Sequence, residues 1–214
     1  KELPMACFII GAGSFYGLSQ RPVPGDTVIA ADGGLTHTEK LGIRPDAIIG
    51  DFDSLHYIPT GAEVFPVEKD DTDSMLAIKL GLSRGYDRYL IYGGLDGVRL
   101  DHTVANYQAL QYLADRGARG ILIGKDFCSA VIKNGSVHFP ADRQGDISVF
   151  CMGPDAQGVD IEGLYYTLDH GTLTSGFPLG VSNHFTEKKA RIAVERGSLL
   201  ILWRRAAGLP EFEG

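Results

Sequence analysis

Short apolar runs that end in glycine or aspartate recur along the first 125 residues of the chain. They occupy residues 8–11, 28–32, 48–51, 89–93 and 121–124. Between them, residues 73–83 and 101–116 carry apolar side chains at helical spacing, and Gly85 and Gly117 are placed as C-terminal stops. Because strands covered on both faces read as continuous apolar runs, this alternation predicts an α/β domain with a mostly parallel sheet.

The pattern changes after about residue 127. Helical periodicity ends, and short segments rich in β-branched and aromatic residues follow, separated by turn signals such as Asn134-Gly135 and Arg196-Gly197. The segments are 130–133, 136–139, 146–151, 158–161, 190–195 and 199–203. We expect antiparallel hairpins that form a C-terminal all-β sandwich domain over residues 128–214, after an N-terminal α/β domain over residues 1–127.

Composition narrows the classes of function. The 214-residue chain is 44% hydrophobic and 22% charged, with a formal net charge of −7, as in an ordinary globular protein. No run approaches the roughly 20 apolar residues of a membrane span, and an acidic chain without a basic block argues against nucleic acid as the main partner. The first apolar run is too short for a secretory signal, and three widely spaced cysteines suggest neither disulfides nor zinc. We therefore expect a cytoplasmic protein with a small-molecule partner.

Two carboxylates, Asp51 and Asp53, follow the third apolar run. The two-residue period of an extended chain aims both to one side, where their mutual repulsion requires a compensating cation. Hard carboxylate oxygens suit Mg²⁺, which also binds substrate phosphates. The alternative at this position is an Asx turn that only ends the strand.

Asp71, Thr72 and Asp73 open the first predicted helix. One aspartate there is expected to be the N-cap, which leaves a second carboxylate to complete an oxygen-ligand set with Asp51 and Asp53. Thr72 and the free N–H groups of the first turn can bind phosphate oxygens.

The loop before the second predicted helix also carries groups that bind phosphate. Gly93 and Gly94 permit close backbone approach, and Arg99 can hold a phosphate through two hydrogen bonds. Asp101 either caps the helix or orients a nucleophile beside a metal, and both roles stay open. We interpret His102 as a neighbour of the cap.

Two other glycine segments follow apolar runs. Asp32 and Gly33 repeat the strand-to-loop placement and predict another wall of the same cleft. Residues 11–17 resemble a dinucleotide fingerprint, but the final spacing is wrong and no clean helix follows, so this signal is weak. A G-x-x-x-x-G-K-[ST] phosphate loop is absent from the sequence.

Taken in chain order, these segments resemble the thiamin pyrophosphokinase family. The matching segments are residues 32–34, 50–54, 71–73, 93–106, 163–168 and 180–183. The resemblance covers nearly the whole chain and implies a catalytic α/β domain, a β-sandwich that binds thiamin, and a homodimer. It further implies that ATP and thiamin are the substrates and that thiamin diphosphate and AMP are the products.

The resemblance also implies roles for individual residues. Asp51, Asp53 and Asp73 are the expected ligands of Mg²⁺ and the carboxylates of pyrophosphate transfer, and Asp101 belongs with them or with the substrate. The implied ATP-binding residues are Asp32, Gly33, Thr72, Gly93, Gly94 and Arg99. The implied thiamin-binding residues are Tyr166, Ser182 and Asn183. Tyr165 departs from the family pattern, in which lysine is common at this position.

Two other functions fit part of the pattern. A metal-dependent phosphohydrolase would use the same aspartates to activate water, but it gives no role to Tyr166, Ser182 and Asn183. A noncatalytic nucleotide- or vitamin-binding module would use the glycine loops for phosphate and the aspartates only as helix caps. The number of aspartates argues against such a module.

Overall fold

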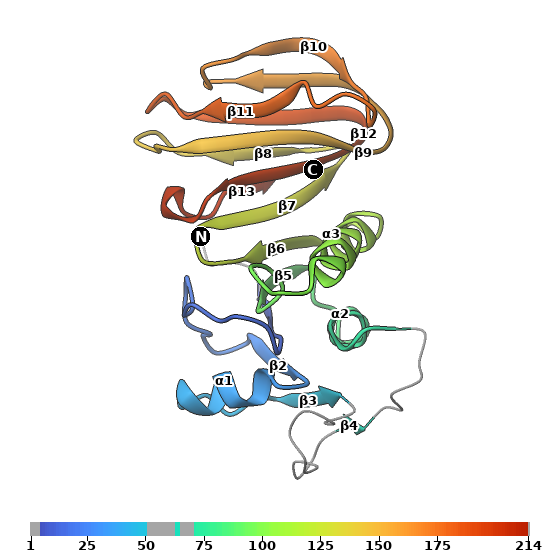
Figure 1. The fold of residues 1–214 in the computed structure, drawn as a ribbon, viewed down its shortest axis with the longest axis vertical. Helices are drawn as coiled ribbons and strands as arrows, with labels where there is room; N and C mark the ends of the chain where they lie inside the picture. Colours follow the sequence, from blue (N-terminus) through green and yellow to red (C-terminus); the bar gives the residue numbers. More distant parts are fainter. Residues whose placement is uncertain (1–4, 51–62, 65–70, 214) are drawn as a thin grey trace. The chain divides into compact units, whose positions relative to one another are not determined.

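The computed structural model describes residues 5–50, 63–64 and 71–213 (Figure 1). Its internal contacts divide the chain into two compact units. The first consists of Lys1–Ala109 with Gly120–Lys125, and the second of Leu110–Arg119 with Asp126–Gly214. Among the described residues, no helix is both long and apolar enough to cross a lipid bilayer.

Parallel strands form the centre of the first unit. They are β1 (Cys7–Ile10), β2 (Thr27–Ala31), β3 (Ala47–Gly50), β4 (Glu63–Val64) and β5 (Arg88–Tyr92), and β6 (Arg119–Ile123) follows in the chain. Parallel ladders join β5, β1, β2, β3 and β4 in that order. Every residue of β1 and β2 is buried, which explains why these strands read as continuous apolar runs in the sequence.

Three helices accompany these strands. They are α1 (Gly34–Lys40), α2 (Asp73–Ser83) and α3 (Leu100–Ala114). In Figure 1, α2 and α3 lie together beside the strands and α1 lies apart from them. The two longer helices were expected from apolar spacing, and Gly85 and Gly117 adopt positive φ after their ends, as predicted. The sequence did not predict α1, which is only seven residues long.

Antiparallel strands form the second unit. They are β7 (Phe127–Lys133), β8 (Ser136–Phe139), β9 (Asp146–Glu162), β10 (Leu168–Leu173), β11 (Gly180–His184), β12 (Ala190–Arg204) and β13 (Glu211–Glu213). The long strands β9 and β12 pair with each other, and β12 also pairs with β7 and β8. Phe139 packs edge-on against Phe185 and Trp203, with centroid distances of 5.0 and 5.5 Å, in the core of this unit.

The structure corrects two expectations about the strands. The ladders of the first unit are parallel, as expected, but the β-structure taken over all described residues is mixed rather than mostly parallel, because antiparallel ladders dominate the second unit. The two expected hairpin turns are also wrong. Arg196-Gly197 lies inside β12 at an irregularity of its ladder with β9, and Asn134-Gly135 joins β7 and β8, which both pair with β12. Because β12 is long enough to pair with two consecutive strands, these pairs do not close hairpins.

Candidate functional site

A cavity of about 460 Å³ opens at the carboxyl ends of the parallel strands in the first unit. The loops that follow β1, β2 and β5 line it, together with the N-terminal turns of α2 and α3. Its lining residues are Gly11, Ala12, Gly13, Ser14, Ala31, Asp32, Thr72, Asp73, Ser74, Gly93, Gly94, Gly97, Val98, Arg99, His102, Thr103, Ala105 and Asn106. Carboxyl ends of parallel strands meet at one edge of a sheet, so residues far apart in the chain converge there.

Backbone rather than side chains forms one part of the cavity, which we call the glycine wall: Gly11, Gly13, Gly93 and Gly94. A Cβ at Gly13 would overlap the carbonyl of Gly93, and a Cβ at Gly93 would lie 2.5 Å from the carbonyl oxygen of Gly11. Gly93 also has a φ of +74°. The two loops can therefore approach each other this closely only because both positions are glycine. Without side chains, this part of the cavity wall consists of backbone.

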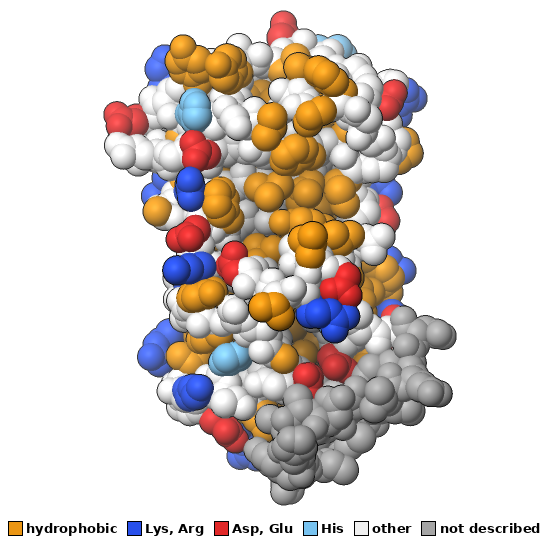
Figure 2. Space-filling model, viewed as in Figure 1, with side chains coloured by type: hydrophobic (Ala, Val, Ile, Leu, Met, Phe, Trp, Pro, Cys, Tyr) orange, Lys and Arg blue, Asp and Glu red, His pale blue; other side chains and the backbone are white. Residues whose placement is uncertain are grey.

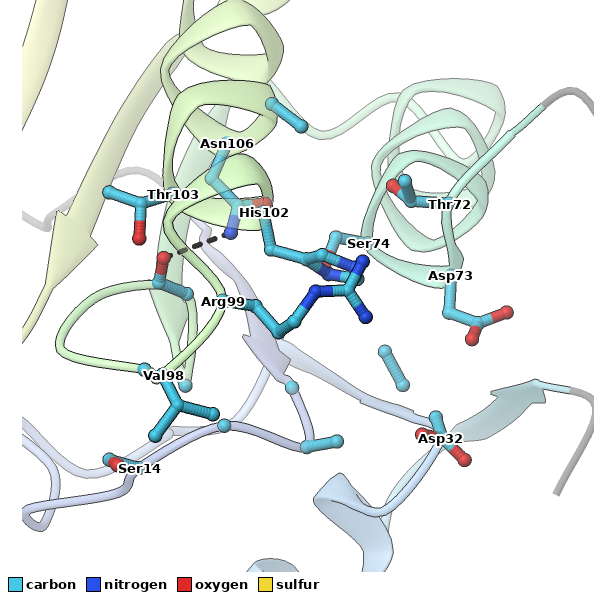
Figure 3. A pocket seen from close by; sticks show the side chains of 18 residues that line it. Ser14, Asp32, Thr72, Asp73, Ser74, Val98, Arg99, His102, Thr103 and Asn106 are labelled. Atoms are coloured by element: carbon cyan, nitrogen blue, oxygen red, sulfur yellow. Dashed lines mark hydrogen bonds between the residues drawn. The ribbon is translucent and has the colours of Figure 1, made fainter. Parts of the chain in front are cut away.

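Asn106 holds the glycine wall from α3. Its Nδ2 donates a hydrogen bond of 2.9 Å to the Gly94 carbonyl, drawn as the dashed line in Figure 3. The Asn106 side chain is 8% exposed, so this bond is largely protected from water. It ties the β5 loop to the helix that follows it.

The N-terminus of α2 contributes the next part of the lining. Thr72 is its N-cap, and the Oγ1 atom accepts a hydrogen bond of 3.2 Å from the N–H of Met75. The expectation that an aspartate caps this helix is therefore wrong, because the hydroxyl satisfies the orphan donor. Asp71 instead accepts a hydrogen bond of 2.6 Å from Lys79 Nζ, and Asp73 lies in the first helical turn.

Two carboxylates, Asp32 and Asp73, line the same cavity. Figure 3 shows them on one side of it, with Arg99 reaching in from another. The predicted metal ligands Asp51 and Asp53 follow β3 and lie outside the described residues. Within the described part of the chain no group of three metal-binding side chains occurs. The pair that is described offers only hard oxygen donors, which fits Mg²⁺ beside phosphate.

Arg99 and Asp101 form an ion pair at the beginning of α3. Nη2 of Arg99 lies 2.6 Å from Oδ2 of Asp101 and its Nε lies 2.9 Å from Oδ1. Hydrogen bonds from Arg99 lower the pKa of Asp101 to about 2. Arg99 lines the cavity, whereas Asp101 lies in the first turn of α3 outside the lining set. The structure thus links Asp101 to the cavity through Arg99.

The predicted thiamin-binding residues lie in the second unit and differ strongly in exposure. Tyr166 is 61% exposed and Ser182 is exposed, whereas Asn183 is only 3% exposed. The Asn183 Oδ1 accepts hydrogen bonds of 2.9 Å from the N–H groups of Tyr166 and His184, and its Nδ2 donates one of 2.7 Å to the Tyr166 carbonyl. Asn183 therefore holds the backbone that presents Tyr166.

Large hydrophobic side chains are exposed around this part of the second unit. They are Tyr165, Tyr166, Phe177, Leu179 and Val181. The rings of Tyr165 and Tyr166 meet edge to face at 4.9 Å, and Figure 2 shows hydrophobic side chains gathered over the strands of this unit. Exposed aromatic surface of this kind is typical of a binding site.

The cavity is also lined by residues to which the sequence pattern gave little or no role in binding. Residues 11–14 were a weak signal, yet all four line it, together with Ser74, Thr103 and His102. The available signal was the position of Gly11 directly after a buried apolar run. The wrong spacing for a dinucleotide fingerprint hid it, because this cavity uses the glycines for close packing between loops.

Two family models match the chain in order. "Thiamin pyrophosphokinase, catalytic domain" matches residues 24–122, and "Thiamin pyrophosphokinase, vitamin B1 binding domain" matches residues 136–199. Together they account for well over half of the chain. The chain belongs to the thiamin pyrophosphokinase family.

Individual members of the family agree with this result. The thiamine pyrophosphokinase of Bacillus subtilis is 26% identical over 183 residues, which is 81% of this chain and 85% of that protein. A crystal structure of the B. subtilis protein gives a TM-score of 0.84 at 23% identity, covering 93% of this chain and 98% of that one. Thiamin pyrophosphokinase from Candida albicans gives 0.72 at 13% identity, with 94% and 89% covered. The chain therefore shares its fold with these proteins even though the sequence identities are low.

Proposed function

We propose that the chain transfers the pyrophosphoryl group of ATP to the hydroxyl group of thiamin, which gives thiamin diphosphate and AMP. The observation that carries this proposal is the ordered match to a catalytic domain and a vitamin B1 binding domain of one family. A phosphohydrolase is not favoured, because it gives no role to the matched vitamin-binding segment, and a noncatalytic module is not favoured, because it gives no role to the matched catalytic domain.

The cavity of the first unit is the proposed ATP site. The N-terminal turn of α2 supplies N–H groups that suit phosphate oxygens, the glycine wall lets a phosphate approach the backbone closely, and Arg99 adds a positive charge. The proposed ATP-binding residues are Asp32, Gly33, Thr72, Gly93, Gly94 and Arg99, of which all but Gly33 line the cavity. Transfer requires the thiamin hydroxyl to attack the β-phosphorus in line, with AMP as the leaving group, so the main task of these residues is alignment.

Carboxylates supply the proposed metal and catalytic residues. Asp73, with Asp51 and Asp53, would hold Mg²⁺, which when bound neutralises charge on the phosphates. Asp73 lies at the cavity beside Asp32, and this pair supports an oxygen-ligand site there. Asp101 fixes the orientation of Arg99 through hydrogen bonds to its Nε and Nη2. An aspartate on the metal side of the cavity accepts the proton of the attacking hydroxyl.

The proposed acceptor site is in the second unit. Tyr166 offers an exposed ring to the thiamin, and Ser182 and Asn183 belong to the same family segment. We retain three further expectations as proposals: a domain boundary between residues 127 and 128, a homodimer, and a cytoplasmic location.

One incubation separates the candidate functions. The protein is mixed with ATP, Mg²⁺ and thiamin, and the products are separated by anion-exchange chromatography. Thiamin-dependent formation of AMP and thiamin diphosphate supports the proposal. Phosphate release without thiamin would assign a hydrolase instead, and unchanged ATP would leave only binding.

Two matched substitutions test the carboxylate role. Asp73→Asn is expected to lower turnover at least ~10²-fold with the fold intact, since a neutral amide is a poor Mg²⁺ ligand. Asp71→Asn is the control, because Asp71 is two residues away and bonds to Lys79 outside the cavity lining. Similar turnover in both variants at saturating Mg²⁺ would remove Asp73 from the site.

A further inference from the structure

Helix α1 holds the loop after β1 at two points. A Cβ at Gly34 would overlap the carbonyl of Ile10, so α1 begins directly against the end of β1. One turn later, Nε2 of His37 lies 3.0 Å from the carbonyl oxygen of Gly13. A carbonyl only accepts, so the Nε2–H of His37 donates this hydrogen bond.

The ring of His37 is itself fixed by aromatic contacts. It stacks on Phe15 with a centroid distance of 5.1 Å and an interplanar angle of 20°. Phe15 in turn meets the edge of Tyr92, whose centroid is 6.0 Å away. Tyr92 is buried at the end of β5, so these ring contacts fix the position of the His37 imidazole relative to the sheet.

Gly13 has no side chain with which to fix its own position. It lies against Gly93 so closely that a Cβ would overlap the Gly93 carbonyl. The loop is held by its neighbours: the N–H of Gly11 donates to the Tyr92 carbonyl at 2.8 Å, and at Gly13 His37 holds it across 24 residues of sequence. The same helix follows Asp32, whose carbonyl accepts a 3.3 Å hydrogen bond from the N–H of Leu35. Two parts of the cavity lining thus depend on the placement of α1.

We propose that His37 is a positioning residue that fixes residues 11–14 in the wall of the nucleotide cavity. His37 does not itself line the cavity, so it acts through the Gly13 carbonyl rather than by touching the ligand. The inference rests on the proposed function in taking the ligand to be ATP. Loss of the bond releases one wall of the phosphate site and weakens ATP binding, whereas the carboxylates that serve transfer stay in place.

Two substitutions that differ by one methylene isolate the hydrogen bond. His37→Gln places an amide donor near the position of Nε2, and His37→Asn carries the same donor too short to reach Gly13. Both remove the stacked ring, so the ring cancels in the comparison. Thr38→Ala is the control: Thr38 is fully buried on the same helix, and its Oγ1 donates to the Leu35 carbonyl at 2.8 Å.

Titration calorimetry with Mg²⁺ and α,β-methylene-ATP measures binding without turnover, and steady-state kinetics gives KM and kcat. We expect His37→Asn to raise the Kd and the KM for ATP about fivefold, the equivalent of one hydrogen bond, with kcat within about twofold. His37→Gln and Thr38→Ala should stay within about twofold of the parent protein in Kd. Thermal midpoints show that each variant is folded.

The proposal would be overturned if the His37→Asn and His37→Gln proteins had the same Kd for the ATP analogue. It would also be overturned if Thr38→Ala raised that Kd as much as His37→Asn does. If His37→Asn does not fold, His37→Gln decides: near-parental affinity supports the hydrogen bond and fivefold loss refutes it. Failure of the proposed function looks different. If the chain is not a transferase, the parent protein either does not bind the analogue or binds it without forming thiamin diphosphate from ATP and thiamin, and neither result depends on His37.

Discussion

Asn183 offers a sharp test of how the acceptor segment is built. The resemblance to the family implied that this residue binds thiamin, but its side chain is 3% exposed and makes three hydrogen bonds to the backbone of Tyr166 and His184. Asn183→Ala removes all three. The principal effect should therefore be on stability rather than on a direct contact with the substrate.

The magnitude follows from the number of bonds and the exposure of their partners. Each net hydrogen bond contributes about 1 kcal/mol, which gives about 3 kcal/mol for three. Tyr166 and His184 are exposed residues whose released backbone groups regain some contact with water. We therefore expect Asn183→Ala to lower the free energy of unfolding by about 2 kcal/mol.

Urea unfolding measures this loss. Trp203 is the single tryptophan of the chain and is fully buried in the second unit, so its fluorescence reports unfolding of the unit that contains Asn183. With a slope of about 2 kcal/mol/M, the midpoint should fall by about 1 M. Coincident transitions by circular dichroism and fluorescence test whether the analysis is two-state.

Ser182→Ala is the matched control. Ser182 precedes Asn183 on β11 and is exposed, and its backbone N–H donates to Ser148 Oγ at 3.1 Å, which the substitution leaves intact. Its midpoint should change little. An Asn183→Ala protein within about 0.5 kcal/mol of the parent protein would refute the structural role, and an unchanged midpoint with a raised KM for thiamin would favour direct contact.

Three other outcomes follow from the described contacts. Thr72→Ala should cost about 1 kcal/mol of stability in thermal unfolding because the N–H of Met75 loses its acceptor, whereas Thr72→Ser should retain most of it. Arg99→Ala should raise the pKa of Asp101 from about 2 toward its ordinary 3.8, as followed by carboxyl NMR titration. Because the folded pKa is the lower one, any stabilisation from this pair is present above the unfolded value and is lost as the pH falls through about 2. In a native thiol assay at pH 8, Cys151 should react first, since burial raises the pKa of the other two cysteines to about 12; simultaneous reaction of all three thiols would contradict this.

Much of the candidate site could be predicted because it depends on local pattern. Apolar runs that end in glycine or aspartate are the carboxyl ends of parallel strands, and the first, second and fourth of them deliver Gly11, Asp32 and Gly93 to one cavity. The helix that begins at Asp73 also has the predicted bounds. Asp51 and Asp53, after the third run, lie outside the described residues, and their metal role stays a prediction.

Other features depend on partners that are distant in the chain. Helix α1 contains two β-branched threonines and starts with glycine, so its propensity is poor, and it forms because Leu35 and Thr38 are buried against the first unit. Asn183 reads as an exposed site residue until β11 pairs with β9 and brings it to the backbone of Tyr166.

The sequence by itself determined strands β1, β2, β3, β5 and β6, the two longer helices and the types of side chain available for phosphate and metal, because hydrophobic periodicity and turn chemistry act over a few residues. It did not predict the two-residue strand β4. Only the tertiary structure decided which groups serve the site directly and which hold it in shape. His37 holds Gly13, and Asn183 holds the backbone of Tyr166. Hydrogen-bond partners are chosen by distance and direction in space, and for His37 and Gly13 that choice is made across 24 residues of chain.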